Sequence, residues 1–180
     1  NSLSAAKGAD LSGKDADFVR NILDGCGFVK YDSKTGEYCF HNLISEYLRK
    51  EFDKLSDELK EKYYLKAADS ELACGEKLSA FELYYKAGAY EKIFSMPHTS
   101  YDLCDIENPQ THKMIFDILD KTPRAVKVKY PESMVPLAFI LFFLNEQQKL
   151  FETVGEIFEV VGESKLSQHE KNRILGETEL

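Results

Sequence analysis

Strand-like patterns in this 180-residue chain are confined to residues 28–40, which limits the β-structure that the chain can form. The segment FVKY at 28–31 is followed by the turn sequence DSKTG, in which Gly36 can adopt a positive φ. In EYCF at 37–40, Tyr38 and Phe40 alternate with their neighbours, as in a half-buried strand. The pattern predicts one β-hairpin in a mainly α fold.

Helical patterns flank this hairpin on both sides. Residues 15–26 form a short amphipathic pattern, and from Leu43 to Leu55 apolar residues again recur at helical spacing. Asn42 is the predicted N-cap of the second helix. Helix, hairpin and helix within 15–55 are the outline of the C-terminal half of a winged-helix domain. Residues 1–14 are small and polar, and we expect a flexible leader there.

From residue 56 onward the sequence shows helical periodicity only. Small residues at Ala67, Ala68, Ala80 and Ala87 allow neighbouring helix axes to approach closely. We therefore predict that 56–180 forms a TPR-like, right-handed array of antiparallel helices. The final GETEL has no helix-stop signal, so we expect the array to be truncated at its C-terminus.

Composition narrows the possible partners. The formal net charge of −8 opposes binding to nucleic acid or to anionic lipid, so neither DNA nor a membrane is an expected partner. The longest apolar run, residues 136–144, is too short for a transmembrane helix. Four cysteines without a C-x-x-C pair are typical of reduced thiols, and we expect a cytoplasmic protein.

FHNLISEYLRKEF at 40–52, followed by KYYLKAADSELACGEKLSAFELYYKAGAYEKIF, resembles the middle of MalT-like, ATP-dependent transcriptional regulators. These are large LuxR-type members of the STAND class of signalling NTPases. The resemblance covers roughly 15–162 and is strongest over 38–94. It implies a non-catalytic segment that couples nucleotide state, through the winged helix, to sensing by the helical array. The implied partners are an NTPase domain of the same chain and an effector, either a small molecule or a protein, on the array. ATP or ADP would bind the parent protein, with no cofactor in this segment.

The resemblance also implies a role for His41. In related NTPases, a histidine within Met-His-Asp at this place points at the phosphates of bound ADP, and the triplet here is Phe40-His41-Asn42. An imidazole beside a helix N-terminus can donate a hydrogen bond to a phosphate. The alternative is a partly buried His41 that bonds a backbone carbonyl.

Other potential sites have simpler explanations. Residues 8–14, GADLSGK, match the start of a phosphate-binding loop, but Asp15 replaces the required hydroxyl and no strand precedes it. Cys26, Cys39 and His41 lack the paired spacing of a metal site. No nucleophile and base have a catalytic spacing, so an enzyme is not expected. The remaining histidines are predicted to be solvated: His98, His112 and His169.

Aromatic residues at 63–90 are more typical of a core than of a ligand platform. If some of them line a groove, Tyr64, Tyr84 and Tyr85 are the candidates for binding a ligand or partner. Three functions therefore remain: a segment of a MalT-like regulator, a helical-repeat scaffold for protein–protein interaction, and a winged-helix DNA binder. The acidic helix at 15–26 argues against the third.

Overall fold

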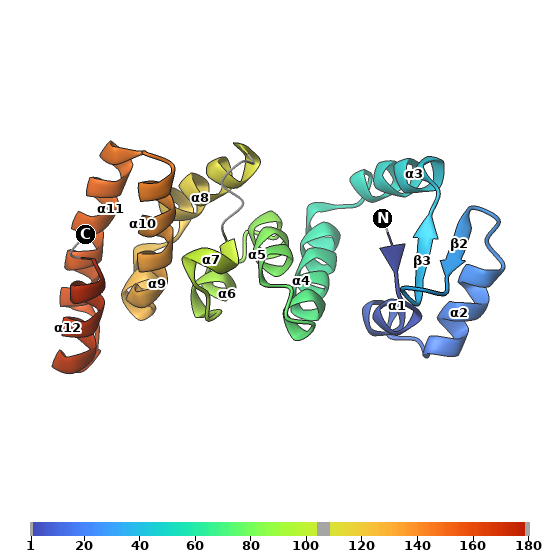
Figure 1. Ribbon diagram of the computed structural model, residues 1–180, viewed down its shortest axis with the longest axis horizontal. Helices are drawn as coiled ribbons and strands as arrows, with labels where there is room; N and C mark the ends of the chain where they lie inside the picture. Colours follow the sequence, from blue (N-terminus) through green and yellow to red (C-terminus); the bar gives the residue numbers. More distant parts are fainter. Residues whose placement is uncertain (1, 104–108, 179–180) are drawn as a thin grey trace.

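The computed structural model describes residues 2–103 and 109–178 and shows a mainly helical, elongated molecule (Figure 1). A small N-terminal unit contains β1 (Ser2–Leu3), α1 (Ala5–Ser12), α2 (Ala16–Asp24), β2 (Val29–Asp32) and β3 (Glu37–Phe40). Within the described residues these three strands form one antiparallel sheet in the order β1-β3-β2. The predicted hairpin is confirmed, with Tyr31 opposite Tyr38 and with Gly36 at a φ of 72° in the turn.

The prediction of a flexible leader at 1–14 is wrong for the described residues. Leu3 pairs with Tyr38, and Ser4 caps α1 by accepting a hydrogen bond from the Lys7 amide. A Cβ atom added to Gly8 would lie 2.8 Å from Cγ1 of Val19 on α2. The small residues of this segment therefore serve close helix packing, which sequence composition does not distinguish from disorder.

The remaining helices follow one another along the long axis of the molecule (Figure 1). They are α3 (Asn42–Asp53), α4 (Asp57–Ala73), α5 (Lys77–Lys86), α6 (Tyr90–Ser95), α7 (Ser100–Leu103), α8 (Pro109–Lys121), α9 (Arg124–Lys129), the 3-10 turn η1 (Pro131–Ser133), α10 (Met134–Phe143), α11 (Gln147–Glu163) and α12 (Gln168–Glu177). These helices from α4 onward confirm that the chain is helical after residue 56 over the residues described. A right-handed TPR-like path stays a prediction.

Two separate cores hold the described residues together. The smaller core joins the sheet to α1 and α2 through Ala5, Val19, Leu23 and Tyr38. The larger core runs from α4 to α12 and includes the following fully buried side chains: Phe81, Tyr84, Phe94, Ile115, Leu137, Leu141 and Ile157. Helix α1 contacts α4, and Lys7 forms a salt bridge of 2.5 Å with Glu71 between them.

One ion pair is enclosed in the helical array. Lys127 on α9 has a side chain that is only 6% exposed, and its Nζ donates to both carboxylate oxygens of Glu156 on α11, at 2.7 and 2.8 Å. Within the described ranges, no helix is both long and apolar enough to cross a lipid bilayer.

Candidate functional site: an apolar groove between α3 and α4

Helix α3 exposes the apolar side that an amphipathic helix normally buries. Leu43, Tyr47 and Leu48 are each about half exposed or more, and Leu43 is 64% exposed. None of the residues of α3, all of which the structure describes, is buried or belongs to either core. Because a contiguous exposed apolar surface commonly marks a binding site, this side of α3 is a candidate interface. We call Leu43, Tyr47 and Leu48 the α3 stripe.

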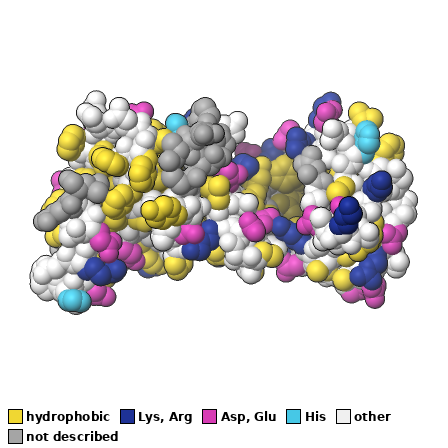
Figure 2. All heavy atoms as spheres, viewed as in Figure 1, with side chains coloured by type: hydrophobic (Ala, Val, Ile, Leu, Met, Phe, Trp, Pro, Cys, Tyr) yellow, Lys and Arg dark blue, Asp and Glu magenta, His cyan; other side chains and the backbone are white. Residues whose placement is uncertain are grey.

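The α3 stripe continues into a groove of about 560 Å³ between α3 and α4. Phe52 lines this groove, with its ring edge-on to Tyr64 at 5.2 Å between centroids and tilted against Tyr63 at 6.3 Å. Figure 2 shows a hollow with hydrophobic side chains between the N-terminal unit and the helical array. The groove lining comes from α1, α3, α4, α5 and the α3–α4 turn: Leu11, Leu48, Glu51, Phe52, Leu55, Tyr63, Tyr64, Lys66, Ala67 and Leu83.

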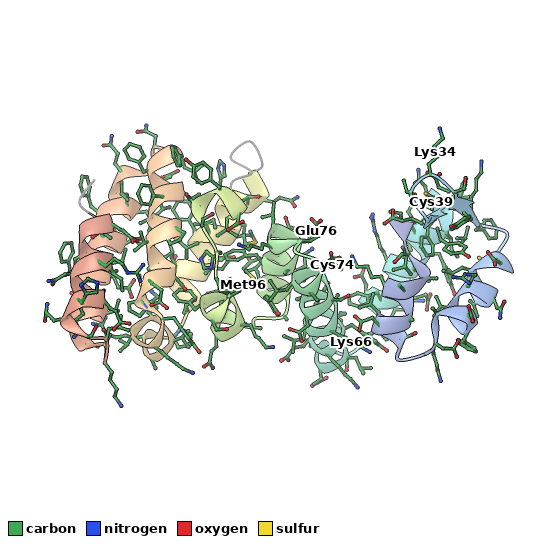
Figure 3. The ribbon with its side chains drawn as sticks, turned by 60° about the horizontal axis from the view of Figure 1, so that its bottom comes forward. Lys34, Cys39, Lys66, Cys74, Glu76 and Met96 are labelled. Carbon is green, nitrogen blue, oxygen red and sulfur yellow. The ribbon has the colours of Figure 1, made fainter. Side chains whose placement is uncertain are left out.

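Two charged residues, Glu51 and Lys66, are among the residues that line this groove. Glu51 is paired with Lys54 at 2.6 Å, and Lys66 lies on the side of α4 that lines the groove (Figure 3). The Lys7–Glu71 pair joins the α1 and α4 walls. A concave surface that is mainly apolar and includes a few charged residues is suited to a hydrophobic partner segment rather than to a reactive small molecule.

The three candidate tyrosines are not brought together. Tyr64 lines the groove, whereas Tyr84 is only 1% exposed and its hydroxyl donates to Asp69, which also accepts from Lys92. Burial raises the pKa of Tyr84 well above its usual range. The Tyr85 hydroxyl donates to Asp117, and this hydrogen bond raises the pKa of Tyr85 to about 12. Tyr84 connects two helices inside the array, so its prediction as a groove residue is wrong, whereas Tyr85 is partly buried and lines a separate small pocket between α5 and α8.

His41, not Asn42, is the N-cap of α3. His41 has extended backbone angles, and its Nδ1 accepts a hydrogen bond of 3.2 Å from the Leu43 amide. Asn42 is the first residue of the helix, so the capping prediction was one residue too late. The His41 ring is exposed. Because Nδ1 is the acceptor, this hydrogen bond assigns the proton of the neutral ring to Nε2, which can donate to a partner.

The capping role gives a first testable prediction. Replacing His41 by Ala should destabilise the first turn of α3 by about 1 kcal/mol, because the Leu43 amide loses its acceptor. His41→Asn should retain the cap, since Asn is a strong N-cap residue. Hydrogen exchange at the Leu43 amide measures the effect: it should be faster in His41→Ala and near the wild-type rate in His41→Asn. Equal rates in wild type and His41→Ala would show that the cap has no effect.

The prediction that the other histidines are solvated is wrong for His98. Its Nδ1 donates to the Met96 carbonyl at 2.7 Å, and its ring lies edge-on to Phe81. Burial lowers the pKa of His98, although the Met96 and Ser133 carbonyls and Asp102 oppose that shift. His112 is partly buried, and His169 is exposed as predicted. Burial of His98 was not predictable from local patterns, because Phe81 and Ser133, which approach its ring, lie on other elements of the fold.

The structure also shows where the phosphate-loop-like segment and the cysteines lie. The phosphate-loop-like residues 8–14 form the second half of α1 and its C-terminal turn, with Gly13 at a φ of 71°, so they do not make a loop. Across the described residues, no group of three or more His, Cys, Asp or Glu side chains is arranged to hold a metal ion. Cys26, Cys39 and Cys74 are free thiols, and Cys104 lies outside the described residues.

Comparison of the chain with protein-family models, curated proteins and solved structures gives no match.

Proposed function

We propose that this chain is a non-catalytic protein-interaction module whose groove between α3 and α4 binds an amphipathic helix of a partner protein. The observation that supports this proposal is the exposed α3 stripe, which is continuous with the groove through Leu48. The predicted cytoplasmic location is part of the same proposal.

The shape and chemistry of the surface favour a helical partner segment. From Leu43 to Leu55 the stripe and groove extend along about 18 Å of helix, which matches roughly three turns of a partner helix. A helix satisfies its own backbone hydrogen bonds, so it can dock on apolar side chains without needing an exposed strand edge. Phe52, Tyr63 and Tyr64 offer aromatic surface for anchor side chains of the partner.

A display library of short helical peptides tests this proposal. Wild-type protein should enrich peptides with apolar residues at i, i+3, i+4 and i+7, and those peptides should lose binding to Tyr47→Asp. The matched control is Tyr101→Asp, because Tyr101 is 88% exposed and lies on α7, away from the groove. The proposal would be contradicted if the selected peptides bound Tyr47→Asp and Tyr101→Asp equally well. It would also be contradicted if the selection enriched no amphipathic sequence.

A second candidate function is favoured by His41. We also consider the chain as the central segment of a MalT-like regulator, in which the Nε2–H of His41 donates to a phosphate of ADP bound to an NTPase domain of the same chain. The exposed ring at the α3 N-terminus, with Nδ1 already occupied, supports this role. The helical array would then sense an effector molecule or protein.

Two substitutions, made in the full-length regulator of which this chain would be a segment, separate the phosphate-binding role of His41 from its role as a helix cap. Both His41→Ala and His41→Asn remove the Nε2–H donor, but only His41→Ala removes the cap. Loss of a charge-assisted hydrogen bond made only in the ADP-bound state should raise basal transcription roughly 10- to 150-fold in both variants. If only His41→Ala changes basal transcription, the histidine acts as a helix cap and the nucleotide role is excluded.

A further inference from the structure

A second exposed apolar surface lies at the turn between α10 and α11, far from the α3 stripe along the molecule (Figure 1). Phe142, Phe143 and Phe151 are 54%, 50% and 73% exposed. We call these three residues the Phe surface. Phe142 and Phe151 line a groove of about 470 Å³ whose remaining lining residues are Leu141, Asn145, Glu146, Gln147, Leu150, Val154 and Thr178.

A backbone turn and a ring contact lie at this surface. Asn145 has a φ of 57°, and the Glu146 amide donates to the Leu141 carbonyl at 3.0 Å, which closes the end of α10. The Phe142 and Phe143 rings pack edge-to-face at 5.8 Å between centroids. Two rings that pack against each other lose less conformational freedom when a partner covers them than two isolated exposed rings would.

The charge at this groove has one sign. Glu146 is the sole charged residue among the described lining residues, and it forms no salt bridge with any described side chain. Lys149, one turn further along α11, is already paired with Asp120. The chain as a whole has a net charge of −8. A partner that covers the Phe surface therefore meets an uncompensated negative potential.

We propose that the groove beside the Phe surface binds a basic amphipathic helix, with apolar anchors between the phenylalanine rings and Lys or Arg side chains facing Glu146. Charge complementarity selects this partner, since anionic lipid, nucleic acid and a second copy of this acidic chain would all be repelled. The proposal is independent of the groove between α3 and α4.

Two synthetic peptides of about 18 residues test the proposal by fluorescence anisotropy. They share one apolar face, and their polar faces are built from Lys and Arg or from Glu and Asp. The basic peptide should bind at least about 10-fold more tightly, with a difference that shrinks at high salt. Glu146→Gln should reduce this salt dependence.

Substitutions locate the binding site. Phe151→Ala should weaken binding of the basic peptide about 30-fold, as expected for loss of an aromatic anchor. Phe18→Ala is the matched control, because Phe18 is also exposed but lies on α2. Circular dichroism should show unchanged folding for both variants. Tyr47→Asp on α3 should leave binding of the basic peptide unchanged. The test of the groove beside the Phe surface is therefore independent of whether the groove between α3 and α4 binds a partner.

Several outcomes would overturn the proposal. These are equal binding of the two peptides, an equal effect of Phe18→Ala and Phe151→Ala, and loss of binding in Tyr47→Asp. A Phe151-dependent dimer in light scattering without peptide binding would identify a second copy as the occupant. Phe151-dependent binding to anionic vesicles without peptide binding would identify a membrane surface instead.

Discussion

Glu156→Ala should lower the free energy of unfolding by about 3 kcal/mol, because it leaves the Lys127 ammonium enclosed without its counter-charge. The Lys127 side chain is 6% exposed and the Glu156 side chain is 28% exposed, so removal of the acid has the more severe consequence. A loss of about 3 kcal/mol is at the lower end of the range for breaking a buried ion pair, since the Glu156 side chain is partly exposed to water. For a chain of this size the melting temperature should fall by about 6–12 °C, as followed by circular dichroism.

Two further variants separate charge burial from packing. Lys127→Met keeps most of the side-chain volume and leaves a partly hydrated carboxylate, so it should cost only about 1 kcal/mol. Lys127→Met combined with Glu156→Leu should be close to wild type, because an apolar pair of similar size avoids the desolvation of both charges. Equal destabilisation by Glu156→Ala and by the double variant would show that lost packing, not an unpaired charge, is responsible.

Tyr84→Ala should cost about 4 kcal/mol in unfolding free energy, as expected for deletion of a fully buried aromatic ring. Tyr64→Ala is the comparison, because Tyr64 is only partly buried and loses mainly its packing against Phe52, worth about 1 kcal/mol. Urea unfolding measures both. Similar values for the two variants would contradict the assignment of Tyr84 to the core and Tyr64 to the groove.

The hydroxyl of Tyr84 contributes a separate part of this energy. Tyr84→Phe should cost about 1.5 kcal/mol near neutral pH, at the low end for a hydrogen bond to a charged group because Asp69 is about half exposed. The hydrogen bond from Tyr84 lowers the pKa of Asp69 in the folded state. The stabilisation from this hydrogen bond is therefore fully present above the pKa of Asp69 in the unfolded chain, which is about 3.9. It is lost as the pH falls through the lower pKa that Asp69 has in the folded protein. The difference between Tyr84→Phe and wild type should accordingly shrink in acid.

The two apolar grooves lie on separate parts of an elongated molecule whose larger core runs between them (Figure 1). This core connects α4, which forms one side of the first groove, to α10 and α11 beside the second groove. Under the two proposals, one chain would bind two partner helices at separate sites.

Local sequence determined the elements whose hydrogen bonds and apolar contacts close within a few residues. The hairpin at 28–40, with its glycine turn, was predictable because the alternation and the positive φ of Gly36 are local properties. Helices α4 and α5, with Gly75 and Gly88 just beyond their ends, were predictable for the same reason. The exposed α3 stripe was visible only as an amphipathic pattern, because periodicity gives the apolar face of a helix but not whether another element covers it.

Tertiary structure alone decided which of these residues meet. Residues 2–12 became a strand and a helix because β3 offers partners 35 to 37 residues further along the chain and α2 offers a partner 11 residues further along. Tyr84 turned inward, because α4 and α6 pack around it, whereas Tyr64 remained at a groove beside Phe52 of α3. The pairing of Lys127 with Glu156 and the isolation of Glu146 likewise depend on how α9, α10 and α11 pack. Contacts between distant segments depend on loop closure and on packing of the whole chain, and neither is encoded in the pattern of any single segment.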